Sequence, residues 1–149
     1  MNFDDLEKQM IGLVEGEKNF IANLANVSSL LFHSMSDLNW CGFYLWDETD
    51  QELVLGPFQG KPACLRIKPE RGVCGAAYTR GEAVLVDDVH AFPGHIACDA
   101  ASESELVVPL KKNGKILGVL DIDSPKLARF TEEHKLGFTR LMETLSRFC

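Results

Sequence analysis

Five cysteines are the side chains of this 149-residue chain whose type best supports chemistry. Three of them lie in or beside expected loops: Cys64, Cys74 and Cys98. The other two look structural: Cys41 lies in an aromatic run typical of a buried strand, and Cys149, the last residue, is expected to be frayed or exposed. Because five is odd, full disulfide pairing fits poorly. We therefore expect the loop cysteines to carry the reaction.

Cys98 is the strongest candidate for the nucleophile. It lies in the irregular segment 90–104, HAFPGHIACDAASES, and reacting groups concentrate in long loops held by a rigid scaffold. Its acidic neighbours Asp99, Glu103 and Glu105 would raise the pKa of its thiol. A permanently charged thiolate is therefore not expected, and a reaction that consumes a proton together with an electron pair suits the site better.

Two further features support such a reaction. Asp121 and Asp123 alternate with Ile122 at the end of the apolar run ILGVLDID, so that both carboxyl groups point to one face of a strand. Cys74, in RGVCG, lies at the expected start of a short helix, where the helix dipole would lower the pKa of its thiol if it faced solvent. A solvated strand end is the alternative interpretation of the two aspartates.

Sulfoxide reduction matches these parts. A thiol attacks the electrophilic sulfur, a carboxylic acid protonates the departing oxygen, and a sulfenic acid remains on the cysteine. A second thiol then condenses with the sulfenic acid to form a disulfide, which an external dithiol must reopen. A carboxyl group held protonated by like-charged neighbours would supply the proton.

Rival chemistries use the histidines. Zinc could be bound by Cys64, Cys74, His90, His95 and Cys98, but only the two histidines have a spacing typical of such sites, so no metal is expected. A cysteine protease would combine Cys98 with His90 or His95 and an orienting group, and this alternative stays open. No phosphate-binding glycine motif is present, so no bound nucleotide cofactor is expected.

Composition narrows the partners and the setting. The 22 acidic and 15 basic residues give a net charge of -7, which disfavours nucleic acids and anionic membranes. With 46% hydrophobic residues, a single folded domain over residues 1–149 is expected. The N-terminal segment has neither a basic start nor a long apolar run, so we expect a cytoplasmic protein whose thiols are kept reduced.

The elements that must position these residues follow from periodicity. Apolar residues at three- and four-residue steps over 3–31 predict a long amphipathic helix, weakened at Gly12 and Gly16, that packs on its own domain or pairs with a second subunit. Thr131 is expected to cap a C-terminal helix, and Asn113-Gly114 to form a hairpin turn. The remaining patterns predict a short helix within 71–81 and strands over 40–46, 52–55, 63–67, 83–89, 105–110 and 115–122. Successive hairpins indicate an antiparallel sheet with helices on one face, an α+β fold.

Several segments together resemble the free methionine-(R)-sulfoxide reductases, which are built on a GAF domain. These segments are NWCGFYL, LVLGPFQGKPACLRI, RGVCG, DVHAFPGHIACDAASESELVVPL and LGVLDIDS, and the resemblance runs over residues 39–129. It implies a GAF-like antiparallel sheet with the N- and C-terminal helices packed on one face. It also implies reduction of the R epimer of free methionine sulfoxide to methionine.

The resemblance assigns roles residue by residue. The nucleophile of the family falls on Cys98, its resolving cysteine on Cys64, and its third cysteine, of auxiliary role, on Cys74. The family's substrate acids and aromatic pocket walls fall on Glu105, Asp121, Asp123, Trp40 and Tyr44. No bound cofactor is implied; thioredoxin or a similar dithiol protein, supplied ultimately by NADPH, would reopen the disulfide. A homodimer through the terminal helices is a further expectation.

One alternative belongs to a different class. Many GAF domains bind a small ligand as sensors and catalyse nothing. A sensor normally needs an output domain, for which this length leaves no room, and it has no need for three carboxyl groups beside three loop cysteines. The reductase is therefore the preferred interpretation.

Overall fold

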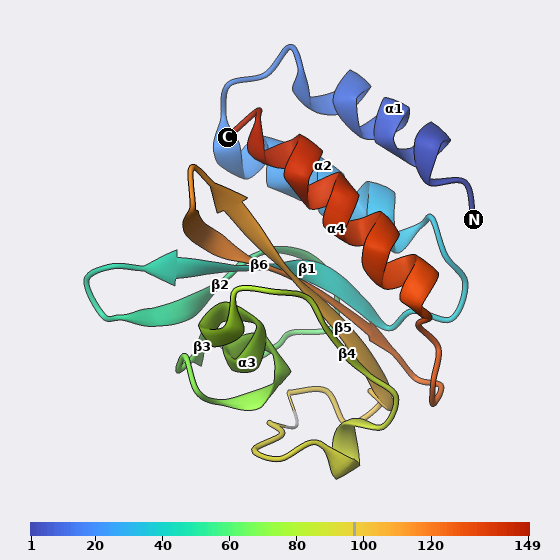
Figure 1. Ribbon diagram of the computed structural model, residues 1–149, viewed down its shortest axis with the longest axis vertical. Helices are drawn as coiled ribbons and strands as arrows, with labels where there is room; N and C mark the ends of the chain where they lie inside the picture. Colours follow the sequence, from blue (N-terminus) through green and yellow to red (C-terminus); the bar gives the residue numbers. More distant parts are fainter. Residues whose placement is uncertain (97) are drawn as a thin grey trace.

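The computed structural model describes residues 1–96 and 98–149 and shows a six-stranded antiparallel sheet flanked by helices (Figure 1). The strand order is β3-β2-β1-β6-β5-β4. The strands are β1 (Trp40–Asp47), β2 (Glu52–Gly60), β3 (Arg66–Ile67), β4 (Val84–Val86), β5 (Ser104–Lys112) and β6 (Lys115–Ser124). The GAF-like α+β architecture expected from the sequence is confirmed.

The hairpin turn expected at Asn113-Gly114 is present, and β1 and β2 form a second antiparallel hairpin. At the tip of the β5–β6 hairpin, Asn113 and Gly114 have φ of 54° and 77°, the positive values that a tight two-residue turn needs. The strand expected over 63–67 is shorter, because only Arg66 and Ile67 pair with β2. The residues before them form a loop whose backbone carbonyl groups accept hydrogen bonds from side chains of β1.

The terminal helices cover one face of the sheet, as expected (Figure 1). They are α1 (Phe3–Val14), α2 (Phe20–Phe32) and α4 (Glu132–Ser146), where α2 and α4 pack on the strands and α1 packs on α2 and α4. The C-terminal helix begins after Thr131, whose side chain accepts from the backbone N–H of His134. A fourth helix, α3 (Gly72–Arg80), lies on the opposite face, against β5 and β6.

The prediction of one long N-terminal helix is wrong. The chain leaves the helix after Val14, passes Gly16, and begins again where the Asn19 side chain accepts from the N–H of Ala22. Asn is a strong N-cap residue, and glycine is a poor helix former, so both favour a break at this point. The apolar stripe therefore serves two helices that pack on different surfaces.

Strand β1 divides its side chains between two cores. Cys41 and Phe43 point into the core beneath α2 and α4, whereas Trp40 and Tyr44 point into the core beneath α3. The structural role expected for Cys41 is confirmed, since its side chain is fully buried. The expectation for Cys149 is wrong: it is half-buried, packs against the first core and lies 3.4 Å from the carbonyl oxygen of Leu145.

Within the described residues, no helix combines the length and the apolar character needed to cross a membrane.

Candidate functional site

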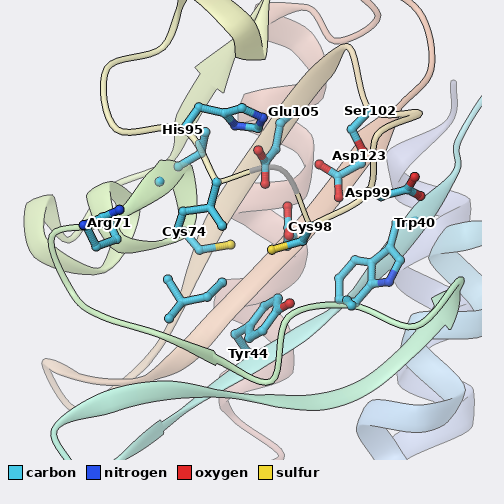
Figure 2. A pocket seen from close by; sticks show the side chains of 16 residues that line it. Trp40, Tyr44, Arg71, Cys74, His95, Cys98, Asp99, Ser102, Glu105 and Asp123 are labelled. Atoms are coloured by element: carbon cyan, nitrogen blue, oxygen red, sulfur yellow. The ribbon is translucent and has the colours of Figure 1, made fainter.

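A cavity on the α3 face brings the predicted site residues together (Figure 2). Its walls come from β1, β3, β5, β6, the start of α3, the loop between β2 and β3, and the loop that follows the short 3-10 helix η1 (Val89–Ala91). The predicted residues that line it are Trp40, Tyr44, Cys74, Cys98, Glu105, Asp121 and Asp123. Segments far apart in the sequence therefore form one chemical site.

Three carboxyl groups lie side by side on β5 and β6. Glu105 on β5 pairs in register with Asp123 on β6. Asp121 lies two residues before Asp123, on the same face of β6. All three are less than a tenth exposed, which excludes the alternative of a solvated strand end. The prediction that Asp121 and Asp123 share one face of a strand is therefore confirmed, and both are buried together with Glu105.

Burial sets the protonation of this cluster. Burial away from solvent is the main cause that raises the pKa of all three carboxyl groups. The rise is strongest for Glu105 and Asp123, because the charge of Asp121 raises their pKa values further. Asp121 differs because hydrogen bonds from Glu105 and Cys74 favour its charged form and oppose the rise in its pKa. Asp121 is therefore the carboxyl group of the three that loses its proton most readily.

Asp121 also has a free oxygen. Among the described residues, its buried Oδ1 atom has no hydrogen-bond partner. A buried unpaired carboxylate oxygen is costly, and it is stabilised when a ligand supplies a donor. The cavity therefore offers an acceptor to a positively charged or N–H-bearing group.

Cys74 lies next to this cluster. It is the third residue of α3 and only 3% exposed, and its sulfur lies within 4.8 Å of carboxylate oxygens of Glu105 and Asp121. Burial, and then the charge of Asp121, raise the pKa of its thiol. The condition under which the helix dipole would lower that pKa is thus not met, and Cys74 is a neutral donor to Asp121.

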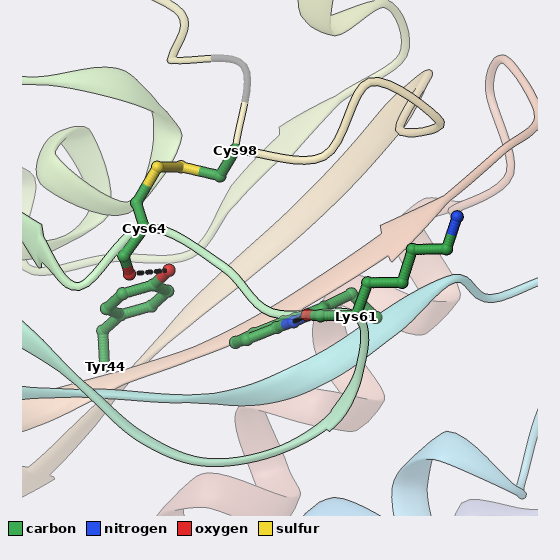
Figure 3. The surroundings of a disulfide bond; sticks show 5 residues. Tyr44, Lys61, Cys64 and Cys98 are labelled. Atoms are coloured by element: carbon green, nitrogen blue, oxygen red, sulfur yellow. Dashed lines mark hydrogen bonds between the residues drawn. A yellow bond between two sulfur atoms is a disulfide. The ribbon is translucent and has the colours of Figure 1, made fainter.

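Cys98 is bonded to Cys64. The sulfur–sulfur distance is 2.01 Å and the Cα–Cα distance 5.3 Å, across a sequence separation of 34 residues (Figure 3). Cys98 extends from the loop before β5, whereas Cys64 belongs to the loop between β2 and β3. A disulfide therefore joins two loops at the edge of the acidic cavity.

The aromatic residues of β1 hold the Cys64 loop by its backbone. The Tyr44 hydroxyl donates to the carbonyl oxygen of Cys64 at 2.8 Å, and the Trp40 indole N–H donates to that of Lys61 at 3.1 Å (Figure 3). Burial, and then the charge of Asp121, raise the pKa of Tyr44, so its hydroxyl keeps its proton. Trp40 and Tyr44 therefore position Cys64 in addition to lining the cavity.

Trp40 requires a glycine beside it. A Cβ atom on Gly60 would lie 2.6 Å from the Trp40 ring, and the φ of Gly60 is +134°. The ring also stacks on Phe58 with centroids 5.0 Å apart. The start of the Cys64 loop is thus shaped by a close approach that only glycine permits.

The Cys98 loop is fixed by residues that the sequence interpretation missed. Asn39 donates from Nδ2 to Asp99 at 2.9 Å and to Ser102 at 3.0 Å. The backbone N–H of Ala101 and then the Asn39 amide lower the pKa of Asp99, which remains charged. No spacing rule connects Asn39 to a residue 60 positions away, so only the fold could reveal this contact.

Arg71 is a second missed residue. It lines the cavity immediately before α3 and offers an exposed guanidinium group (Figure 2). Its position next to a predicted helix start was the available signal, because helix N-termini and arginines both favour anions.

Among the described residues, no histidine and cysteine lie in one group close enough to hold a metal ion, as the zinc alternative requires. His90 Nδ1 lies 3.4 Å from Asp88 and 3.5 Å from Glu103 on the outer surface, while His95 lines the cavity. Two of the proposed zinc ligands, Cys64 and Cys98, are bonded to each other.

Comparisons with known proteins agree with this geometry. The GAF domain family matches residues 22–148. The free methionine-R-sulfoxide reductase of Escherichia coli (strain K12) is 51% identical, covering 97% of this chain and 87% of that protein. The Saccharomyces cerevisiae protein of the same name is 40% identical, covering 100% and 88%. The X-ray structure of free methionine-R-sulfoxide reductase from Neisseria meningitidis in complex with its substrate has a TM-score of 0.95 and 44% identity, covering 98% of this chain and 87% of that one. The chain therefore belongs to the GAF-domain family and, within it, to the free methionine-R-sulfoxide reductases.

Proposed function

We propose that this protein reduces free L-methionine-(R)-sulfoxide to methionine, with Cys98 as the nucleophile and Cys64 as the resolving cysteine. The proposal rests above all on one observation: Cys98 lines a cavity that holds three buried carboxyl groups and is at the same time bonded to Cys64. Nucleophile, acid and second thiol are the three parts that the reaction needs.

The acids bind and protonate the substrate. The free oxygen of Asp121 accepts from the substrate ammonium group, which a buried carboxylate stabilises by a charge-assisted hydrogen bond. Arg71 and the backbone N–H groups of Val73 and Cys74, at the start of α3, are donors for the substrate carboxylate, whereas the N–H of Gly72 already donates to the carbonyl oxygen of Gly94. A pocket that binds both charged ends selects the free amino acid over a methionine sulfoxide within a polypeptide.

The chemistry then proceeds in two steps. The Cys98 sulfur attacks the sulfoxide sulfur while Glu105 or Asp123, the two carboxyl groups whose pKa burial raises most, protonates the oxygen, so that methionine leaves and Cys98 becomes a sulfenic acid. The Cys64 thiol attacks that sulfenic acid and releases water, which gives the disulfide. A dithiol protein such as thioredoxin returns both cysteines to thiols, and no bound cofactor takes part.

The disulfide state restricts the cavity. In this state the space open to the centres of water-sized molecules is about 40 Å³. One water needs roughly 10 to 15 Å³ by the same measure, so the cavity holds only a few waters and not an amino acid. We therefore infer that the Cys98 loop moves when the disulfide is reduced, and that the reduced protein binds the substrate.

Purified R and S epimers test the proposal. Each epimer of free methionine sulfoxide is offered to the protein with thioredoxin, thioredoxin reductase and NADPH, and NADPH oxidation is followed. Turnover of the R epimer alone, lost in Cys98→Ser, is the expected result. No turnover of either epimer, with active thioredoxin and reduced protein verified, would replace the reductase by a ligand-sensing GAF module.

A further inference from the structure

The two sulfurs of the disulfide have different surroundings. Cys98 is among the residues that line the acidic cavity (Figure 2), whereas Cys64 belongs to a loop that reaches the cavity through Ala63. Cys64 lies in the loop that leads to β3, the edge strand of the sheet. Because Pro62 and Leu65, on either side of this part of the loop, are exposed, a reductant as large as a protein can approach the bond from the Cys64 side.

The surface around Cys64 is suited to contact with a protein. The docking surface consists of four exposed residues that flank Cys64 in the sequence: Lys61, Pro62, Leu65 and Arg66. Leu65, directly after Cys64, is 71% exposed, although its carbonyl oxygen accepts from the N–H of Leu55 at 2.9 Å. An anchored backbone thus presents a large apolar side chain next to a reactive sulfur, and ordered apolar anchors are efficient contacts in interfaces.

We propose that a dithiol protein of the thioredoxin class binds this docking surface and attacks the Sγ atom of Cys64, with Cys98 as the leaving group. The inference rests on the proposed function, because only a catalytic disulfide must be reopened in every cycle. The reductant thiolate bonds to Cys64 as the Cys64–Cys98 bond breaks, and Cys98 leaves as a thiolate that takes up a proton. The second thiol of the reductant then displaces Cys64, so the reductant becomes a disulfide and both cysteines become thiols.

Attack on Cys98 instead meets two obstacles. The cavity beside Cys98 offers about 40 Å³, which is too little for the reactive loop of a protein. The Cys98 loop is also held in place, since Asn39 bonds both Asp99 and Ser102. Attack on Cys64 requires neither entry into the cavity nor opening of this loop.

Trapping the intermediate identifies the attacked sulfur. The oxidised full-length protein is mixed with a thioredoxin whose second active-site cysteine is replaced by serine, quenched with acid at short times, and digested without reduction for mass spectrometry. We expect the thioredoxin peptide to be bonded to the peptide that contains Cys64. A bond to the Cys98 peptide at the earliest times would overturn the proposal.

A pair of matched variants tests the docking surface. Leu65→Asp is compared with Leu136→Asp, because Leu136 is 70% exposed and lies in α4, on the other face of the sheet. We expect Leu65→Asp to lower kcat/KM for thioredoxin by roughly five- to tenfold, with reduction by dithiothreitol unchanged, and Leu136→Asp to behave as wild type. Equal slowing with both reductants, or no slowing with thioredoxin, would contradict the docking surface.

A separate measurement distinguishes the two proposals. Methionine formed in a single turnover of fully reduced protein involves no reductant. If no methionine is formed, the proposed function fails; if methionine is formed and the trapped bond involves Cys98, only the docking proposal fails.

Discussion

Three buried carboxyl groups lie together where little solvent screens the repulsion between them: Glu105, Asp121 and Asp123. The sequence predicts the common face of the aspartates, because a period of two is a local property of a strand. It does not predict the contact between Cys74 and Asp121, which depends on how α3 packs across the sheet. Local patterns thus identify the acids, and tertiary packing determines which of them loses its proton most readily.

The raised pKa values predict how stability depends on pH. In the unfolded chain the three carboxyl groups lose their protons near pH 4, while the folded protein keeps protons on Glu105 and Asp123 to higher pH. Over that interval the folded state binds more protons, so the free energy of unfolding falls as pH rises, by about 1.4 kcal/mol per pH unit for each extra proton. We expect Glu105→Gln to make this slope shallower, as measured by urea denaturation between pH 4 and pH 8.

An exposed glutamate provides the control for that measurement. Glu82 lies in the turn after α3 and is exposed, so Glu82→Gln should keep the wild-type slope. A slope that Glu105→Gln leaves unchanged would show that Glu105 does not hold a proton in the folded state.

At the level of secondary structure, strand β1 holds the loop that follows β2. The aromatic run WCGFYLW predicts the strand, and the resemblance to the family implies that Trp40 and Tyr44 wall the pocket. Neither the pattern nor the resemblance indicates that Trp40 and Tyr44 donate hydrogen bonds to the backbone of the Cys64 loop. Every residue has a backbone carbonyl oxygen, so the sequence does not show which one accepts such a bond. The expected strand over 63–67 is shortened where the loop makes these bonds.

Tyr44→Phe tests this positioning. Loss of the hydroxyl leaves the carbonyl oxygen of Cys64 without its donor and frees the loop, at a cost of about 1 kcal/mol. We expect disulfide formation to slow several-fold, so that the sulfenic acid on Cys98 accumulates after a single turnover with substrate. Trapping with dimedone and mass spectrometry measures it; an unchanged yield of trapped sulfenic acid argues against a positioning role for Tyr44.

Helix α1 offers a test of packing on the other face. A Cβ atom at Gly137 in α4 would lie 2.3 Å from the Phe3 ring, which packs edge-on against Phe138. A Cβ atom at Gly12 in α1 would instead meet no atom of the described residues within 4 Å. We expect Gly137→Ala to destabilise the protein by about 1 to 3 kcal/mol through overpacking, and Gly12→Ala to stabilise it by roughly 0.5 to 1 kcal/mol through helix propensity.

Thermal or urea denaturation compares the two alanine variants directly. Opposite signs are the expected result, since both substitutions improve helix propensity and only one meets an obstacle. Stabilisation by both would show that Phe3 moves aside at little cost.

Considered as a whole, the molecule separates stability from chemistry by the two faces of its sheet. Among the described residues, the core beneath α2 and α4 contains none that line the cavity, whereas the core beneath α3 includes Trp40, Tyr44 and Cys74. Composition and periodicity predict the α+β class, because each hairpin and terminal helix has its own local signal. The break in the N-terminal helix was missed, since one apolar stripe serves both halves.

The disulfide adds stability to this arrangement in the oxidised state only. Its sequence separation of 34 residues corresponds to about 3 to 4 kcal/mol in the loop-entropy description. We expect reductant to lower the urea midpoint of the wild type, and to leave that of Cys64→Ser unchanged. A wild-type midpoint that does not respond to complete reduction would indicate that the reduced protein gains compensating contacts.

If the protein works as proposed, the small cavity of the oxidised state also predicts the kinetic order of the cycle. In the proposed cycle, methionine sulfoxide and the reductant bind to different redox states, so we expect no ternary complex and parallel lines in double-reciprocal plots at several thioredoxin concentrations. An excess of methionine sulfoxide then cannot bind the oxidised enzyme and so cannot hinder its reduction. A cell under oxidative stress, in which methionine sulfoxide accumulates, would still have an enzyme that its own substrate does not inhibit.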